Sequence, residues 1–357
     1  MTRPSPEERI SAFFEARGLE VSGQQYLRFD PDGPFTYVFS PDSVGVSLLV
    51  DRLRGAGLKR RVATTAFRGG KLVPGGLRVL PGISSTTVRA PGDAAFGLVI
   101  ASARQLTLLA PRDGIAATVG WPDDDRVADE IITRRRIPDD INVPELIEAD
   151  EAFPYFVTEY VDGRTVENPI EDWDHILNAL VQLQSWYELN GIEWVETVDA
   201  VDKLRNELSR YEDDATIQEG IERLEAIELP QQFAMSETHG DLHCGNLRVV
   251  ENNVYILDWE HTRRRYVHRD FVLPFLQWQR YGNGDGTFES FLRETPPGDR
   301  IGTSYAERIG DTAWDSANWY PGVVLFGLLQ ELALRSPDGS NWNRTHTILE
   351  EAVSVGG

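Results

Sequence analysis

The chain has 357 residues and a formal net charge of −22, and 41% of its residues are hydrophobic. This hydrophobic content excludes an intrinsically disordered chain, and the length is enough for two lobes with a large buried core. The strong negative charge, without any basic stripe along the sequence, argues against nucleic acid and anionic membranes as partners.

Location and assembly follow from the same data. No apolar run reaches the ~20 residues that a membrane-spanning helix needs, and the first residues, MTRPSPEERI, do not form a signal peptide. Cys244 is the only cysteine, so no internal disulfide can form. We therefore expect a cytoplasmic protein, either monomeric or weakly dimeric, with no membrane partner.

The basic residues are unusual, because only Lys59, Lys71 and Lys203 are lysines among 35 lysines and arginines. Acid-rich, lysine-poor chains resemble haloarchaeal cytoplasmic proteins, in which molar salt screens the repulsion between like charges. The acidity is spread along the chain, which favours this interpretation. The alternative is that the negative charge attracts a cationic substrate.

The first ninety residues show few regular patterns. Pro6–Arg17 has a proline and acidic residues at its start, apolar residues at helical spacing and a glycine after its end, so it predicts a helix. Val44–Leu53 is a second candidate helix, and Lys71–Leu80 is strand-like.

The pattern is clearer from Phe96 onward. It predicts strands, then a helix, then two further strands, followed by a helical region in which each helix has an apolar face. The expected strands are 96–102, 105–110, 115–119, 144–148 and 153–161, with a turn at 111–114, and the expected helices are 127–136, 173–190, 198–211, 215–227, 309–319 and 323–335. A turn-rich loop is expected at 278–286.

One stretch, THGDLHCGNLRVVENNVYILDWE, combines the polar residues that a catalytic site needs. Two short apolar strands around an Asn-rich turn predict a β-hairpin between Asn246 and Asp258, which brings both residues to the same end. Asp241 lies on the loop just before the hairpin. Phosphoryl transfer needs a carboxylate near the attacking hydroxyl and oxygen ligands for Mg²⁺, so this arrangement suits that chemistry. A His/Asp metal hydrolase using His239, Asp241, His243 and Asp258 is a less favoured alternative.

The stretch resembles the signature motif of the aminoglycoside phosphotransferase and choline kinase family, in which HGDLHxGN is followed by an apolar strand and IDWE or IDFE. Here it reads HGDLHCGN and ILDWE. The resemblance implies an α+β, bilobal protein-kinase-like fold, with an antiparallel-sheet lobe for the nucleotide within residues 1–161 and a mainly helical lobe within residues 162–357. It also implies an Mg²⁺-dependent enzyme that moves the γ-phosphoryl group of ATP, or of GTP, to a hydroxyl of a small metabolite.

The resemblance assigns roles to residues of the motif. Asp241 would be the catalytic base, and Asn246 and Asp258 would be the Mg²⁺ ligands. The structural supports of the loop would be His239, His243 and Asp270.

In the first lobe the resemblance is weaker. A loop over the nucleotide phosphates would lie at 82–87 and include Ser84, Ser85 and Thr86, although a surface hairpin turn is at least as good an interpretation. Glu130 would be the acidic residue of the lobe's helix. The hinge that holds the adenine edge through its backbone would be formed by Glu159, Tyr160 and Val161.

The sequence departs from the family at one position. The strand before the helix should carry a lysine that pairs with the phosphates and with Glu130, but Ile115–Val119 has none. Either the strand assignment is shifted and Arg104 or Arg112 takes the role, or the role is dispensed with, or the protein is a nucleotide-binding or regulatory module without turnover. The run from Arg263 to Arg265 reads first as solvated charge; it could alternatively attract an anionic acceptor or replace the lysine.

Overall fold

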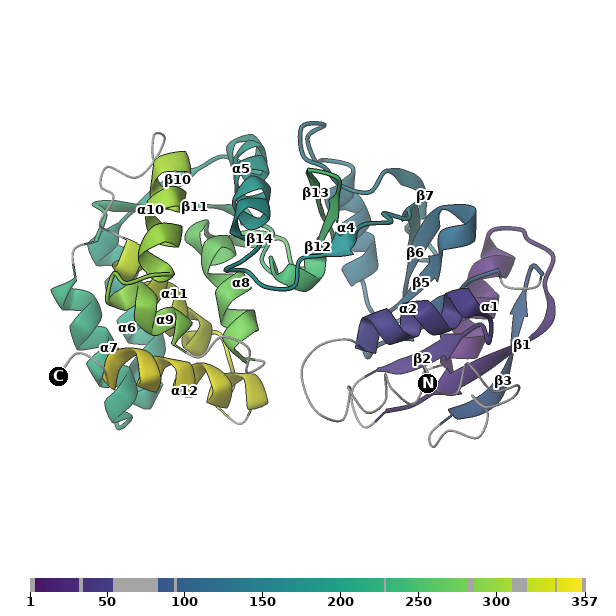
Figure 1. The fold of residues 1–357 in the computed structure, drawn as a ribbon, viewed down its shortest axis with the longest axis horizontal. Coiled ribbons are helices and arrows are strands. Elements are labelled where there is room, and N and C mark those ends of the chain that lie inside the picture. The colour runs from purple at the N-terminus through teal and green to yellow at the C-terminus, as the bar shows by residue number, and fades with distance from the viewer. Residues whose placement is uncertain are drawn as a thin grey trace. The chain divides into compact units, whose positions relative to one another are not determined.

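The computed structural model describes residues 4–31, 35–53, 83–92, 95–227, 229–280, 286–309, 320–337 and 339–354. The chain divides into two compact units (Figure 1). Unit 1 comprises residues 1–136 and 144–162, and unit 2 comprises residues 137–143 and 163–357. The predicted fold class is confirmed, because unit 1 contains a large antiparallel sheet and unit 2 is mainly helical. The short segment 137–143 belongs to unit 2, which no local pattern in the sequence indicated.

Unit 1 is built on an eight-stranded sheet with the order β3-β1-β2-β4-β5-β6-β8-β7, in which every neighbouring pair is antiparallel. The predicted strands from 96 to 161 are all present. The strands are β1 (Ser22–Phe29), β2 (Thr36–Phe39), β3 (Ile83–Ala90), β4 (Leu98–Ala101), β5 (Gln105–Ala110), β6 (Ile115–Gly120), β7 (Leu146–Asp150) and β8 (Tyr155–Glu159). The strand-like segment 71–80 lies outside the described residues.

Strand side chains alternate between the two faces of the sheet, so each face carries apolar residues. Three helices pack on these two faces. Helix α1 (Pro6–Ala16) starts at a capping box formed by Ser5 and Glu8, and its apolar residues pack on the face that carries Val99 and Val157. On the opposite face lie α2 (Ser43–Leu53), which packs near Leu98, and α4 (Arg126–Arg134), which packs on Phe156. The helix that carries Glu130 therefore lies directly on the sheet.

Unit 2 combines two small sheets with a set of packed helices. Its sheets have the orders β10-β11-β14 and β13-β12-β9. The strands are β9 (Arg164–Thr165), β10 (Glu193–Glu196), β11 (Gln232–Thr238), β12 (Leu247–Val250), β13 (Asn253–Ile256) and β14 (Arg263–Tyr266). The helices are α5 (Trp173–Leu189), α6 (Thr197–Leu208), α7 (Ala215–Ala226), α8 (His268–Arg280), α9 (Thr287–Leu292), α10 (Gly298–Ile309), α11 (Tyr320–Ala333) and α12 (Ser340–Val353).

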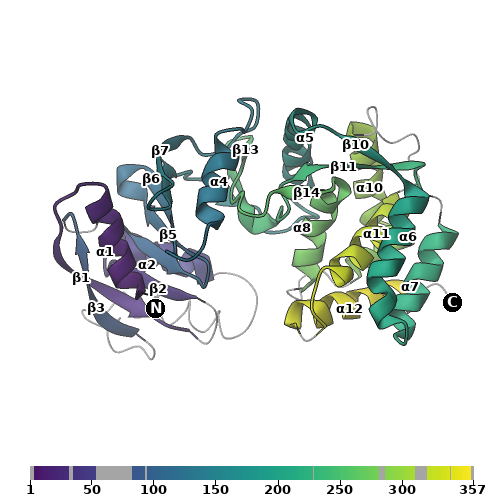
Figure 2. The same cartoon turned by 180° about the vertical axis from the view of Figure 1, so that it is seen from behind.

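The core of unit 2 lies around α8 and α11. Helix α11 is buried almost along its whole length and contacts α6, α7, α8, α9 and α12. Figure 2 shows α11 together with α6, α7, α8 and α12 from behind. The expected loop at 278–286 begins too early, because α8 continues to Arg280. The last residues of this helix, Gln279 and Arg280, are polar but buried, and their sequence does not indicate this. The helix expected at 309–319 falls outside the described residues except for Ile309, the last residue of α10.

Within the described residues, none of the helices combines the length and the apolar character that crossing a bilayer requires.

Candidate functional site

The predicted hairpin is present and fixes one end of the candidate site. Strands β12 and β13 pair antiparallel, with Leu247 opposite Ile256 at the open end. Just beyond this pair, the N–H of Leu257 donates to the carbonyl of Asn246 at 2.9 Å. Asn246 and Asp258 therefore lie at the same end of the hairpin, as the sequence predicted. The side-chain amide of Asn246 donates to the carbonyl of Asp241 at 3.0 Å, so Asp241 is held at the same end of the hairpin.

His239 connects the loop to the hairpin and is fully buried. Its Nδ1 accepts a hydrogen bond from the N–H of Asp241 at 3.4 Å, and its Nε2 lies 2.9 Å from the carbonyl oxygen of Leu257. Because Nδ1 acts as an acceptor, the neutral ring carries its proton on Nε2 and donates it to Leu257. Both nitrogens are thus used within the fold, which fits the predicted structural role.

His243 stabilises the turn that follows Asp241. Its Nδ1 accepts from the N–H of Gly245 at 2.9 Å, which places the proton of the neutral ring on Nε2. This Nε2 lies 3.7 Å from the nearer carboxylate oxygen of Asp241, whose side chain is 27% exposed. The carboxylate of Asp241 is therefore partly accessible to solvent, and Nε2 of His243 lies near one of its oxygens.

The donor set fits a hard divalent cation. The amide nitrogen of Asn246 is directed to the Asp241 carbonyl, which leaves the side-chain oxygen of Asn246 for a ligand role. Asp258 follows Leu257 just after the end of β13, and it has a left-handed backbone with φ of 62°, a conformation that Asp tolerates better than most residues. Two oxygen ligands at one place match the one or two protein carboxylates or amides that Mg²⁺ commonly takes beside substrate phosphates.

The metal hydrolase alternative gains no support from the described residues. In the part of the chain that the structure describes, no three or more His, Cys, Asp or Glu side chains are grouped so as to hold a metal ion. His239, which that alternative requires as a ligand, uses both ring nitrogens in the contacts described above.

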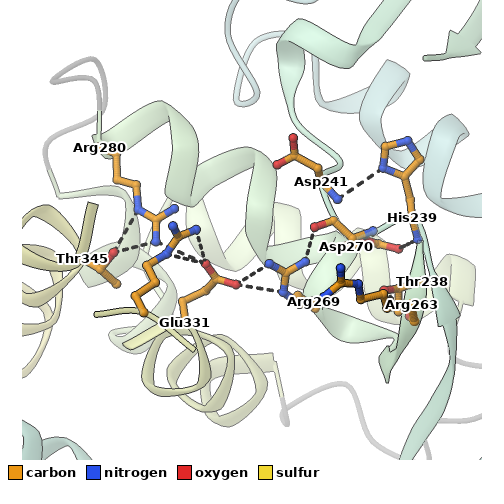
Figure 3. Close-up of polar contacts among 11 residues, drawn as sticks. Thr238, His239, Asp241, Arg263, Arg269, Asp270, Arg280, Glu331 and Thr345 are labelled. Atoms are coloured by element: carbon orange, nitrogen blue, oxygen red, sulfur yellow. Dashed lines mark hydrogen bonds and ion pairs between the residues drawn. The ribbon is translucent and has the colours of Figure 1, made fainter. Parts of the chain in front are cut away.

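The loop is braced from beneath by the start of α8 (Figure 3). Asp270 is fully buried, and its two carboxylate oxygens accept the N–H groups of His239 and Gly240, each at 2.9 Å. The hydroxyl of Tyr187 also donates to Asp270 at 2.9 Å. Burial raises the pKa of Asp270, and the hydrogen bond from Gly240 and the charge of Arg269 act in the opposite direction. Asp270 therefore holds the backbone of the loop at His239 and Gly240, which is consistent with the supporting role that the resemblance implies for it.

Gly240 is the residue that permits this close packing. Its φ is +81°, and a Cβ at this position would lie 2.4 Å from the carbonyl oxygen of His261. Any other residue would therefore displace the loop that carries Asp241.

Glu130 in unit 1 forms an ion pair with an arginine, although the strand before its helix lacks the lysine that was expected to pair with it. Its carboxylate accepts from Arg134, one turn further along α4, with Nε and Nη2 both at 2.9 Å from Oε1. The two side chains are 1% and 6% exposed, and the guanidinium lies over the ring of Phe156 at 4.7 Å. The sequence spacing i, i+4 is typical of a surface pair, so the burial of this one could not be read from the sequence.

Arg134→Met is expected to destabilise the protein by about 3–5 kcal/mol, because it removes one partner of a buried ion pair. The matched control is Arg135→Met, which removes the next arginine, paired with Glu151 at the surface with side chains 51% and 47% exposed. Loss of such an exposed pair should cost at most ~1 kcal/mol. Urea unfolding of both variants measures the difference, and equal losses would contradict the assigned role of Arg134.

The shifted-strand explanation for the missing lysine is not supported. β6 spans Ile115–Gly120, as predicted, and contains no lysine. Arg112 is 54% exposed and pairs with Asp42 at 3.0 Å, and Arg104 lies in the turn between β4 and β5. Neither arginine is the partner that the structure gives to Glu130.

The predicted phosphate loop is wrong. Ser84, Ser85 and Thr86 belong to β3, which pairs residue by residue with β1 at the edge of the sheet. The hydroxyl of Thr86 donates to Glu7 of α1 at 3.1 Å, so it has a structural contact. Hydroxyl and β-branched residues serve a strand as well as a loop, and the pairing partner β1 was not visible in the sequence.

The predicted hinge follows the end of β8. The N–H of Glu159 donates to the carbonyl of Glu145 at 3.0 Å, and that of Tyr160 donates to the carbonyl of Gly114 at 2.7 Å. These two donors are therefore used within unit 1. Of the three predicted hinge residues, Val161 is the one that remains as a candidate N–H donor to a nucleotide.

The arginine run forms β14 and is not simply solvated. Arg264 pairs at 2.9 Å with Glu193 of β10, which lies beyond β11 in the same sheet. Arg265, the next residue, belongs to the opposite face of the strand and is half-buried. Its burial, followed by the charge of Arg269, lowers its pKa to about 10. Arg265 still carries its positive charge at neutral pH, close to the loop residue Gly240.

Comparison with known proteins was made against families, curated proteins and solved structures. Residues 122–289, which contain the loop, the hairpin and α4, match the model of the phosphotransferase enzyme family. This segment belongs to that family. The chain thus carries the core of a small-molecule phosphotransferase enzyme, and the resemblance noted in the motif is confirmed. No curated protein matches the chain.

Several solved structures are similar at low identity. A Ralstonia eutropha protein assigned as an aminoglycoside phosphotransferase has 15% identity over 70% of this chain and 88% of its own, with a TM-score of 0.48. The GDP complex of aminoglycoside 2'-phosphotransferase-IIIa has 14% identity over 71% and 90%, with a TM-score of 0.47. A choline/ethanolamine kinase family protein from Mesorhizobium loti has 15% identity over 70% and 90%, with a TM-score of 0.36. At these scores the likeness adds nothing to the assignment, which rests on the family match.

Proposed function

We propose that this phosphotransferase moves the γ-phosphoryl group of ATP or GTP to a hydroxyl group of a small metabolite, with Mg²⁺ as the metal. The observation that carries the proposal is the convergence of Asp241, Asn246 and Asp258 at one end of the β12–β13 hairpin. The family match of the surrounding segment supports the reaction class, and the donor types support the metal.

Each residue has a distinct task in this proposal. Asp241, whose side chain is partly exposed to the solvent, accepts the proton of the attacking hydroxyl. Asn246 and Asp258 hold the metal ion through oxygen atoms. Bound Mg²⁺ would bridge the nucleotide phosphates and offset their charge. The remaining residues of the loop keep these three groups in place, which is the main requirement for phosphoryl transfer.

The missing lysine is compatible with this function. In the expected arrangement a lysine would neutralise Glu130, but Arg134 already does so from the same helix. The buried carboxylate therefore needs no partner from β6, and Mg²⁺ held at the hairpin can carry the charge of the phosphates.

The absence of a lysine on β6 also motivates the second candidate, a nucleotide-binding or regulatory module without turnover. Such a module would bind Mg-nucleotide through Asn246 and Asp258 but would not consume an acceptor. Turnover is the measurement that separates the two candidates.

Calorimetric titration of MgATP and MgGTP into the full chain tests the proposal, with molar KCl present because of the net charge of −22. Mg²⁺-dependent binding of one nucleotide is expected. A screen of hydroxyl-bearing amines, amino sugars and sugars, read by nucleoside diphosphate release, should then give turnover. Absence of binding by both nucleotides would overturn the proposal, and binding without turnover on any acceptor would favour the regulatory module.

A further inference from the structure

A buried ionic cluster lies directly below the loop that carries Asp241 (Figure 3). Its centre is Glu331 on α11, whose side chain is 1% exposed. One carboxylate oxygen of Glu331 accepts from Arg269 at 2.6 and 2.8 Å, and the other pairs with Arg335 at 2.8 Å and Arg280 at 3.3 Å. Arg280 also donates to the hydroxyl of Thr345 on α12. The cluster therefore connects three helices of unit 2.

Only one arginine of the cluster reaches the catalytic loop. Arg269 is 6% exposed, and its Nη1 donates to the carbonyl oxygen of Gly240. This carbonyl belongs to the peptide group whose N–H is that of Asp241, and the same N–H donates to His239. The peptide that leads into Asp241 is thus held on its oxygen side by Arg269 and on its nitrogen side by His239.

The hydrogen bond from Arg269 to Gly240 requires the arginine side chain to stay in one conformation, and an arginine side chain is long and flexible. A buried guanidinium also needs a counter-charge, because leaving it unpaired is costly. Glu331 meets both needs, because one of its carboxylate oxygens accepts from both Nε and Nη2 of Arg269. Burial by itself would raise the pKa of Glu331, but the charges of Arg269, Arg335 and Arg280 outweigh it and lower the pKa to about 2, so the carboxylate is ionised at neutral pH.

We infer that Glu331 is a positioning residue for the phosphotransferase reaction: it fixes Arg269, and Arg269 fixes the orientation of the peptide that presents Asp241. The inference rests on the proposed role of Asp241. It assigns to α11, which is far from the motif in sequence and outside the segment that matches the family, a part in setting the geometry of the catalytic loop through Arg269.

The test compares Glu331→Gln with the matched control Arg335→Gln. Gln keeps the size of Glu331 but removes its charge, whereas Arg335 binds the same carboxylate without contacting the loop. Glu331→Gln should lower kcat by about ten- to a hundredfold with the KM for nucleotide nearly unchanged, since a small misplacement of a catalytic group has effects of this size. Arg335→Gln should leave kcat within about twofold, because the side chain of Arg335 is 26% exposed and does not contact the loop.

A second readout does not depend on turnover. Amide hydrogen exchange of His239, Gly240 and Asp241 should be at least about tenfold faster in Glu331→Gln and in Arg269→Gln than in Arg335→Gln. The reason is that the loop opens locally when the hydrogen bond from Arg269 to Gly240 is weakened or lost. Arg269→Gln serves if Glu331→Gln does not fold. Equal exchange in all variants, or equal loss of kcat in Glu331→Gln and Arg335→Gln, would overturn the inference. If the wild-type protein shows no turnover, the exchange rates alone still decide it, so its failure is distinct from failure of the proposed function.

Discussion

Asp241→Asn is expected to lower kcat by roughly 10²–10⁴, the contribution that a positioned general base makes to proton transfer. The substitution keeps the size of the side chain but replaces one acceptor oxygen with an amide donor, which removes its ability to accept a proton at neutral pH. The backbone of residue 241, in contrast, makes the contacts that hold the loop, and these remain in the variant. The loss should therefore appear in turnover and not in folding.

The measurement is steady-state kinetics with the best acceptor from the screen, together with nucleotide affinity and the urea midpoint. Affinity for MgATP should stay within about twofold, because Asp241 contacts the acceptor hydroxyl and not the nucleotide in the proposed reaction. Full turnover in the variant would remove Asp241 from the role of base. A large fall in nucleotide affinity would instead place it among the metal ligands.

Asp258→Asn is expected to weaken Mg²⁺-dependent nucleotide binding by at least the roughly 10–100-fold that loss of an outer partner of a metal site costs. Asn is chosen because it tolerates the left-handed backbone of this position, where φ is 62°. The backbone and the hairpin should therefore be preserved, and the change is confined to the charge of one ligand.

The chain offers a close control for this variant. Glu251 is an exposed carboxylate residue at the other end of the same hairpin, and its φ of 55° is also left-handed. Glu251→Gln removes the same charge without touching the proposed site. Calorimetry with MgATP should show normal binding for Glu251→Gln and weakened binding for Asp258→Asn. Similar affinities in the two variants would contradict a metal-ligand role for Asp258.

The sequence predicted the hairpin at the proposed site in unit 2 well, because this structure is local. Asp241, Asn246 and Asp258 lie within eighteen positions of one another, and a short hairpin is enough to bring the last two together. The helices at 173–190 and 215–227 were also accessible, since an apolar stripe along a helix is a local signal.

Other parts depend on contacts between distant segments, which one sequence does not show. β14 consists of three arginines and a tyrosine and becomes a strand because it pairs with β11. The same reason explains the error at Ser84, whose strand is defined by its partner β1. The pairing of Arg269 with Glu331 joins residues 62 positions apart, so it could be found only in the structure.

The eight-stranded sheet of unit 1 has a consequence for how the chain can be shortened. The segment that matches the family starts at residue 122, but β8 within it takes its sheet partner β6 from the part before that residue. A fragment that begins at 122 would present β8 with an unpaired edge and with apolar residues such as Val157 uncovered, and such edges promote aggregation. At the other end, a fragment that stops at 289 would lack α11 and with it Glu331. The part of the chain that is recognisable by family is therefore smaller than the part that must be made for it to fold.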